Sequence, residues 1–352
     1  MTPQFVSRLH SRAGARPLLS RSLRARFFLA CALGASSCGG DSTSPRLAAS
    51  DPLTLSTTAL PALDAAREGR YVLWFLDKAG AAHSAGTITP GSAVAVVTPI
   101  ADPVSARITV ERPGTNGVGP SPQVLLSGGF RDGRASLEVV GAVTQTGVPL
   151  RPRPGQFTMF SPSDNDIHGY PSHEEAGVWL FNMNPSATDQ KDFYVRMAQL
   201  QPGWIYEGWM VRDYGSADEI WLSYGKFLPD WTGTLNSADD TGWGPFSGIT
   251  DYATYRAEDF PGDDWISNPL HLPFPSQLTL PLNLRERDGT GRLRWTHVIS
   301  IEPNTDKGEP IGSERPFLLR PYVDPFGDLN PGMPRTITIH PEAVPSAVLT
   351  LR

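Results

Sequence analysis

The amino-acid sequence predicts an all-β protein. Glycine and proline number 34 each among 352 residues, well above the roughly 12% of average usage for the two together, and both interrupt helices. Short runs rich in β-branched and aromatic residues alternate with turn signals, as at 70–76 and 295–301. Runs of this length and spacing are typical of a sandwich or barrel. We expect two tandem immunoglobulin-like β-sandwich units after a signal peptide and a flexible tether.

The segment 1–37 has the pattern of a secretory signal peptide. Residues 1–26 contain six arginines and no acidic residue, and the apolar run FFLACAL follows at 27–33. A basic region, a short apolar core and small residues are the three parts of such a signal. The apolar core falls well short of the roughly 20 residues that a transmembrane helix needs. We therefore expect export of the chain and removal of 1–37.

Cys38 closes the sequence ASSC at 35–38, which resembles the lipobox of bacterial lipoproteins. In that family a peptidase cuts before the cysteine, whose thiol then carries diacylglycerol. The resemblance implies a lipid anchor on Cys38 and a location in the cell envelope. Gly39 is not the aspartate that retains enteric lipoproteins at the inner membrane, which favours the outer membrane. The alternative is an ordinary cleaved signal with an incidental cysteine.

Removal of the signal would leave an acidic body. The whole chain has 30 basic and 36 acidic residues, and loss of the six arginines changes its net charge from −6 to −12. Such a charge disfavours nucleic acid as a partner. Residues 38–60 are rich in Ser, Thr, Ala and Pro without periodicity, so we expect them to form a flexible linker.

The body contains an internal repeat. YVLW at 71–74 matches YEGW at 206–209, and ITVE at 108–111 matches ISIE at 299–302. The repeat predicts that one arrangement of strands is used twice. Smaller matches accompany these: Gly80 with Gly215, 86–88 with 225–227, Pro120 with Pro310, and 124–126 with 317–319.

The repeat also sets the expected domain boundaries. The first sandwich unit is expected over 61–145 and the second, larger one over 146–330. The remaining segment, 331–352, contains one more short β-type run, so we expect it to add edge strands.

The second copy resembles a known extracytoplasmic domain. YEGW at 206–209, GKF at 225–227 and ISIEP at 299–303 look like the core motifs of the extracytoplasmic, C-terminal domain of anti-sigma-K factors. The resemblance covers 155–325, and 61–130 more weakly, and it implies a β-sandwich rather than a chemistry. A full anti-sigma factor also has a cytoplasmic sigma-binding domain and a transmembrane helix. This sequence has the pattern of neither, so we expect no direct contact with a sigma factor.

An insertion at 228–270 interrupts the second copy. It carries eight acidic, one basic and seven aromatic residues. A loop of this length is usually functional or disordered, and its aromatic content argues against disorder. Aromatic planes can stack on sugars or peptides, whereas the alternative is a lid over the sandwich with solvated acids. The candidate binding surface comprises Trp231, Trp243, Trp265, Asp239, Asp240, Asp263 and Asp264.

The segment 164–175 nearly fits a calcium-binding loop. Asp164, Asp166 and Glu175 occupy ligand positions one, three and twelve, with a glycine at position six. His168 at position five is a poor calcium ligand, and the flanking segments have the pattern of strands rather than of EF-hand helices. A calcium-stiffened loop remains an alternative to an acidic hairpin loop without metal, which we favour.

Other polar residues give weaker signals. His168 and His173 with Glu174 are candidates for zinc, but no third histidine lies nearby. Glu111 and Glu302 hold equivalent positions in the repeat. We expect them to accept hydrogen bonds within hairpins rather than to act as a catalytic carboxylate pair. We assign no catalytic residue and no required cofactor.

The expected function is a non-catalytic binding or sensory module, anchored in the envelope and recognising an envelope glycan or protein. One alternative is a cell-surface hydrolase that acts on glycans through carboxylates of 228–270. Such a pair would lie about 5–10 Å apart in one cleft. A second alternative is a purely structural envelope protein.

Overall fold

The computed structural model describes most of the chain from residue 46 onward. Contacts group 43–352 into one compact unit, apart from 1–42. The described part of this unit consists of antiparallel strands and short 3-10 helices, which confirms the expected all-β architecture. No helix within it has the length and apolar character needed to cross a membrane. The described ranges are 46–115, 118–161, 173–180, 196–228, 236–237, 261–268, 271–304, 316–326 and 330–352.

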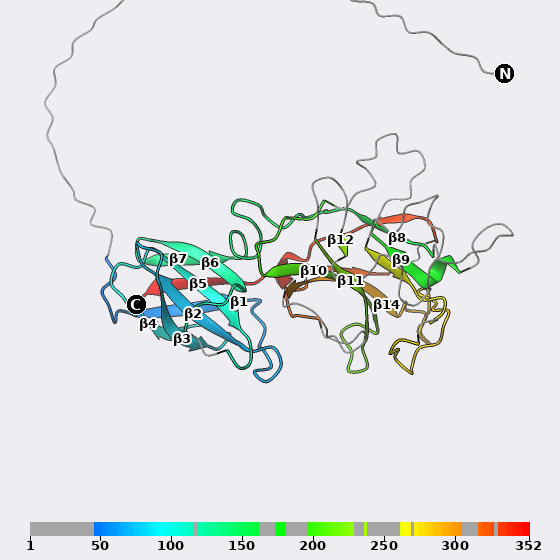
Figure 1. The fold of residues 1–352 in the computed structure, drawn as a ribbon, viewed down its shortest axis with the longest axis horizontal. Coiled ribbons are helices and arrows are strands. Elements are labelled where there is room, and N and C mark those ends of the chain that lie inside the picture. The colour runs from blue at the N-terminus through cyan, green and yellow to red at the C-terminus, as the bar shows by residue number, and fades with distance from the viewer. Residues whose placement is uncertain are drawn as a thin grey trace, which may run out of the picture. The chain divides into compact units, whose positions relative to one another are not determined.

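The first sheet has eight strands. They are β1 (Pro52–Thr58), β2 (Arg70–Leu76), β3 (Ala82–Ile88), β4 (Val94–Val97), β5 (Ser105–Glu111), β6 (Val124–Arg131), β7 (Arg134–Glu138) and β17 (Ser346–Leu351). Their order in the sheet is β3-β2-β5-β6-β7-β17-β1-β4. The edge strands β3 and β4 approach each other, so the sheet curls around its core. Figure 1 shows the red C-terminal strand among the blue and cyan strands of this sheet.

The expectation of a flexible linker over 38–60 is wrong for 52–58, which form β1, whereas 38–45 lie outside the described residues. Leu53 and Leu55 are fully buried, whereas the Ser and Thr residues beside them are not. This alternation marks a strand with one face in the core, and the hydroxyl-rich composition concealed it. The expectation that 331–352 adds edge strands holds for β16 (Pro334–Thr336), which lies at the edge of its sheet, but is wrong for β17, which lies between β7 and β1.

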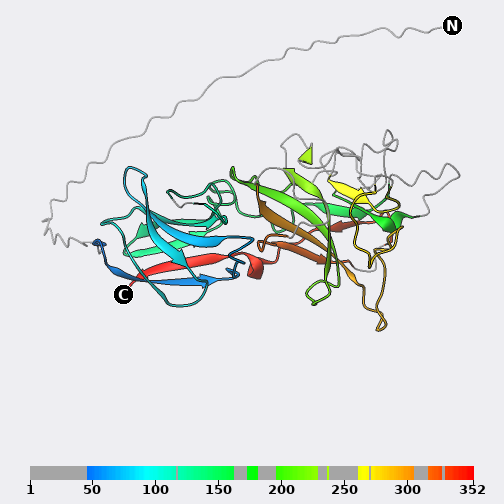
Figure 2. The same ribbon diagram turned by 60° about the horizontal axis from the view of Figure 1, so that its bottom comes forward.

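Two smaller sheets follow. The five-stranded sheet has the order β12-β11-β10-β14-β15, and the four-stranded sheet has the order β13-β9-β8-β16. Figure 2 shows the orange-brown β14 running beside the green β10. The strands are β8 (Gln156–Met159), β9 (Gly177–Trp179), β10 (Trp204–Arg212), β11 (Ile220–Leu228), β12 (Asn236–Ser237), β13 (Gly262–Asp264), β14 (Trp295–Pro303), β15 (Tyr322–Pro325) and β16 (Pro334–Thr336), with 3-10 helices η1 (Glu174–Ala176) and η4 (Pro341–Ala343).

One hydrophobic core connects all three sheets. It runs from Leu55 in β1 through Tyr206 in β10 to Phe157 in β8. Across the boundary expected between 145 and 146, the Gln201 N–H donates to the Val143 carbonyl at 2.7 Å. Contacts therefore do not divide the body at that boundary.

The repeat corresponds to a duplicated three-stranded arrangement. In the first copy β2 pairs with β3 and β5, and in the second β10 pairs with β11 and β14. In both copies the strand that pairs with the central strand has a bulge, whose extra residue is Ala85 in β3 and Tyr224 in β11. A glycine follows the extra residue each time, Gly86 with φ 96° and Gly225 with φ 114°. Only glycine adopts such φ values without strain, which explains why the repeat preserves these residues.

The last matched element needs a shift in register. The N–H of Val110 donates to the carbonyl of Gln123 at 3.0 Å, and the N–H of Ile301 donates to that of Leu319 at 2.8 Å. Gln123 and Leu319 are therefore equivalent. The apolar run at 317–319 corresponds to 121–123, not to 124–126 as its hydrophobicity indicated.

Candidate functional site

Each copy of the repeat contains a buried chain of hydrogen bonds that ends on a carboxylate. In the first copy, the Trp74 indole donates to the Thr109 hydroxyl at 2.9 Å. That hydroxyl donates to Glu111 Oε1 at 2.6 Å. The same carboxylate oxygen accepts the backbone N–H of Ser121 at 2.9 Å and so closes the loop after β5.

The second copy repeats this chain. The Trp209 indole donates to the Ser300 hydroxyl at 2.8 Å, and Ser300 donates to Glu302. Glu302 accepts the N–H of Phe317 at 2.8 Å. Burial raises the pKa of Glu302 to about 7, while these hydrogen bonds and the nearby cation Lys226 act in the opposite direction. The expectation that the two glutamates serve hairpin hydrogen bonds is confirmed.

Because this series of hydrogen bonds occurs in both copies, it belongs to the structure that the copies share. Residues that differ between the copies are better candidates for a site. The paired strands make Trp221 equivalent to Ala82. The matched turns make Tyr214 equivalent to Ala79, and the register after β14 makes Arg320 equivalent to Val124. Large or charged side chains therefore replace small or apolar ones in the second copy alone.

These second-copy residues gather on the outer face of the five-stranded sheet. Trp209, Val211 and Val298 form a small core there, separate from the main one. Trp221 packs edge-on against Trp209, with ring centroids 5.7 Å apart. Tyr214 packs edge-on against Trp221 at the same separation. Both outer rings are half-buried, so the aromatic cluster ends at the protein surface.

Arg320 lies over this aromatic cluster. Its guanidinium carbon is 4.4 Å from the centroid of the Trp221 ring, a cation–π geometry. Within the described residues its hydrogen-bond partners are two backbone carbonyl oxygens, that of Phe317 at 3.2 Å and that of Pro316 at 3.4 Å. The side chain is thus held in place by stacking and by weak polar contacts.

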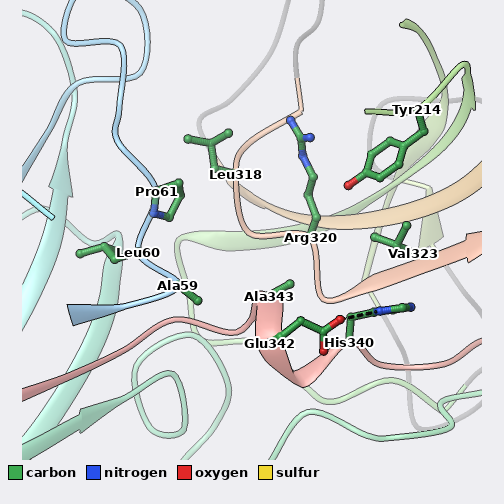
Figure 3. A pocket seen from close by; sticks show the side chains of 10 residues that line it. All are labelled: Ala59, Leu60, Pro61, Tyr214, Leu318, Arg320, Val323, His340, Glu342 and Ala343. Carbon is green, nitrogen blue, oxygen red and sulfur yellow. Dashed lines mark hydrogen bonds and ion pairs between the residues drawn. The ribbon is translucent and has the colours of Figure 1, made fainter. Parts of the chain in front are cut away.

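A pocket of about 550 Å³ opens beside Arg320 (Figure 3). Tyr214 and Arg320 supply polar groups from the five-stranded sheet and its connections. The His340 and Glu342 side chains lie 2.9 Å apart on another side of the pocket. The pKa of Glu342 is lowered by a hydrogen bond from its own backbone N–H, and then by His340. The apolar lining consists of Ala59, Leu60, Pro61, Leu318, Val323 and Ala343.

The far end of the insertion does not belong to an exposed binding surface. Trp265, Asp263 and Asp264 are fully buried. Strand β13, which contains both aspartates, pairs with β9, and the N–H of Trp265 donates to the carbonyl of Ala176 at 2.9 Å. For these three residues the predicted binding surface is wrong, because the segment is part of the core. Trp231, Trp243, Asp239 and Asp240 lie outside the described residues.

The proposed calcium loop can be followed only at its end. Asp164 and Asp166 lie outside the described residues, as do His168 and Cys38. Glu175 is half-buried in η1. In the described part of the chain, no three His, Cys, Asp or Glu side chains form a group that could hold a metal ion.

The neighbouring residue Glu174 has a structural role. Its carboxylate accepts the N–H of Ser161 at 2.9 Å, and the Ser161 hydroxyl donates to the His173 carbonyl at 2.7 Å. Glu174 thereby joins the two ends of the loop between β8 and η1, as Glu111 and Glu302 do for their own loops.

Sequence reasoning missed a buried polar pair under the five-stranded sheet. The Tyr224 hydroxyl and His297 Nε2 lie 2.8 Å apart, and both side chains are buried. Burial lowers the pKa of His297 to about 3, so its imidazole is neutral. The equivalent residues in the first copy are Ala85 and Ala106. A systematic comparison of the copies would have found this pair, and it would also have found Trp221 and Tyr214.

Comparisons of the chain with protein-family models, with curated proteins and with solved structures gave no match. The resemblance to the extracytoplasmic domain of anti-sigma-K factors therefore stays a prediction from the quoted motifs.

Proposed function

We propose that the chain is an exported, lipid-anchored protein of the cell envelope whose folded body is a non-catalytic binding module. The observation that carries the binding role is the pocket beside Arg320. Its volume of about 550 Å³ lies in the usual range of ligand sites, about 300–1,000 Å³. Such sites combine an apolar lining with a few polar groups that converge, as this pocket does.

The comparison between the copies supports the same proposal. The hydrogen-bond chain ending at Glu111 recurs at Glu302. Tyr214, Trp221 and Arg320 have no counterpart of similar size or charge in the first copy. The strand arrangement that the two copies share therefore does not account for these three residues, and a ligand gives them a role.

The signal at 1–37 and the lipobox-like ASSC support export and anchoring. An anchored binding module also agrees with the resemblance to an anti-sigma-type extracytoplasmic domain. In this proposal the module has no sigma-binding region and acts outside the cytoplasm. The outer membrane is its proposed location, with the acyl groups on Cys38 as its contact with lipid.

Anchoring is tested with Cys38→Ala in cells fed a labelled fatty acid. We expect loss of the label and release of the protein from the membrane fraction. Cys31→Ala is the matched control, because Cys31 leaves with the signal, and it should keep both. Retention of label and membrane association in Cys38→Ala would contradict the anchor.

Binding is tested with the secreted, unlipidated chain carrying Cys38→Ser. It is applied to arrays of envelope glycans and of peptides. We expect a ligand whose binding falls at least tenfold in Arg320→Gln and is unchanged in Arg134→Gln, an exposed arginine of β7. If nothing on either array binds, the binding role is wrong.

A further inference from the structure

The Arg320 guanidinium has the donors and the fixed orientation that an anion-binding group needs. Arginine has five N–H donors, and within the described residues the contacts to Phe317 and Pro316 use two of them. The remaining donors form a planar fork that matches a carboxylate. Stacking on Trp221 at 4.4 Å fixes the plane of the fork, so binding an anion costs little side-chain entropy.

The rest of the pocket is aliphatic rather than aromatic. In Figure 3, Leu318 lies between Pro61 and Arg320, and Val323 lies on the other side of Arg320. Sugar rings pack best on open aromatic faces, but the guanidinium of Arg320 covers a face of Trp221. Among the described residues, Tyr214 and His340 are the aromatic side chains that line the pocket, and the imidazole of His340 is paired with Glu342. This lining suits a branched aliphatic group better than a sugar.

Charge is distributed unevenly around the pocket. Arg320 supplies a cation, and the Tyr214 hydroxyl provides a further donor on the same side (Figure 3). Glu342 supplies an anion elsewhere on the rim, next to His340. A ligand with one carboxylate and an apolar group beside it matches this distribution, whereas a ligand with several anionic groups meets repulsion from Glu342.

We propose that this pocket binds the carboxyl terminus of a peptide whose last residue is aliphatic. The terminal carboxylate pairs with Arg320 and receives a hydrogen bond from Tyr214. The last side chain lies on Leu318 and Pro61. This assignment rests on the proposed binding function and specifies its ligand.

The test uses the unlipidated Cys38→Ser chain and a fluorescent hexapeptide that ends in Val, measured by anisotropy. A twin with an amidated terminus isolates the carboxylate, and a twin ending in Lys isolates the apolar group. We expect at least tenfold weaker binding for each twin. Arg320→Gln should abolish the preference for the free carboxylate over the amide.

A second variant guards against misfolding of Arg320→Gln. Leu318 is half-buried at the pocket, so Leu318→Asp keeps the core and places a like charge beside the ligand carboxylate. It should weaken binding at least tenfold with an unchanged melting temperature, whereas Arg134→Gln should bind normally.

The possible outcomes test the ligand class and the binding function separately. Equal binding of the acid and the amide, or preferential binding of a uronic-acid oligosaccharide that Arg320→Gln abolishes, overturns the peptide-terminus assignment and leaves the binding function standing. Binding of any ligand that neither Arg320→Gln nor Leu318→Asp changes overturns the site itself. Absence of binding to all of these probes and to both arrays overturns both proposals.

Discussion

At the scale of single residues, the second copy has a smaller side chain at one position and a larger one at a position on the neighbouring strand. Gly208 stands where the first copy has Leu73, and Tyr224 stands where it has Ala85. A Cβ at Gly208 would lie 1.8 Å from the ring of Tyr224. The glycine of the YEGW motif thus makes room for a buried tyrosine, whose hydroxyl reaches His297.

This exchange predicts a strong coupling between the two positions. Gly208→Ala should destabilise the fold by more than about 2 kcal/mol, because a methyl group is forced into a packed core. Tyr224→Ala should also destabilise it, by about 3–5 kcal/mol. In the double variant the Gly208→Ala substitution should cost much less than it does alone. Urea unfolding of the four proteins measures the coupling, and additive losses would contradict the packing argument.

His297 predicts a loss of stability in acid. Burial lowers the pKa of His297 from its ordinary value of 6.5 to about 3 in the folded protein, so the unfolded chain binds the extra proton between these pH values. The contribution of the neutral imidazole is complete above pH 6.5 and declines as pH falls toward 3. Between pH 6.5 and 4.5 the loss amounts to about 2–3 kcal/mol.

The matched variant is His297→Gln, which can still hydrogen-bond to Tyr224 but does not titrate. Unfolding free energies from urea titrations at several pH values should converge for the two proteins as the solution becomes acidic. Parallel curves would show that His297 does not contribute to the acid sensitivity.

At the scale of elements, the interior of each repeat was predictable and its surroundings were not. Residues 70–76 and 295–301 combine β-branched and aromatic side chains in runs that fit strands, and they form β2 and most of β14. The paired glutamates were also interpreted correctly, since their equivalence in the repeat pointed to a shared structural role.

Strands whose pairing partners are far away in the sequence were not predicted. Strand β1 has only two strongly apolar inward residues, and its pairing with β17 on one side and β4 on the other stabilises it. Strand β13 consists of Gly and Asp alone, a composition that disfavours strands, yet it pairs with β9. Arg320 and Leu60 line the same pocket although they are far apart in the sequence. Local sequence patterns do not predict contacts between such distant residues.

At the scale of the whole molecule, the two ends of the compact unit share one sheet. β17 pairs with β1 on one side and with β7 on the other. Leu349 of β17 is fully buried in the core. Residues 346–351 are therefore an interior part of the sheet whose first strand in the chain is β1.

This arrangement predicts that a short C-terminal deletion is severe. Removal of 346–352 would leave β1 and β7 with unpaired edges and would expose the core around Leu349, so we expect insoluble protein or loss of a cooperative thermal transition. Deletion of Arg352 alone, which is exposed, should leave the transition nearly unchanged. A soluble, cooperatively folding 1–345 chain would contradict the importance of this strand.

The position of β17 also governs when the protein can fold. The ribosome releases the chain from the N-terminus, so β17, which joins β7 to β1, leaves after the other strands of the first sheet. Until β17 is available, β1 and β7 lack their shared partner strand, and the hydrophobic interior of the sheet is exposed to solvent. The first sheet therefore closes only after residues 346–351 have left the ribosome, however early its other seven strands were made.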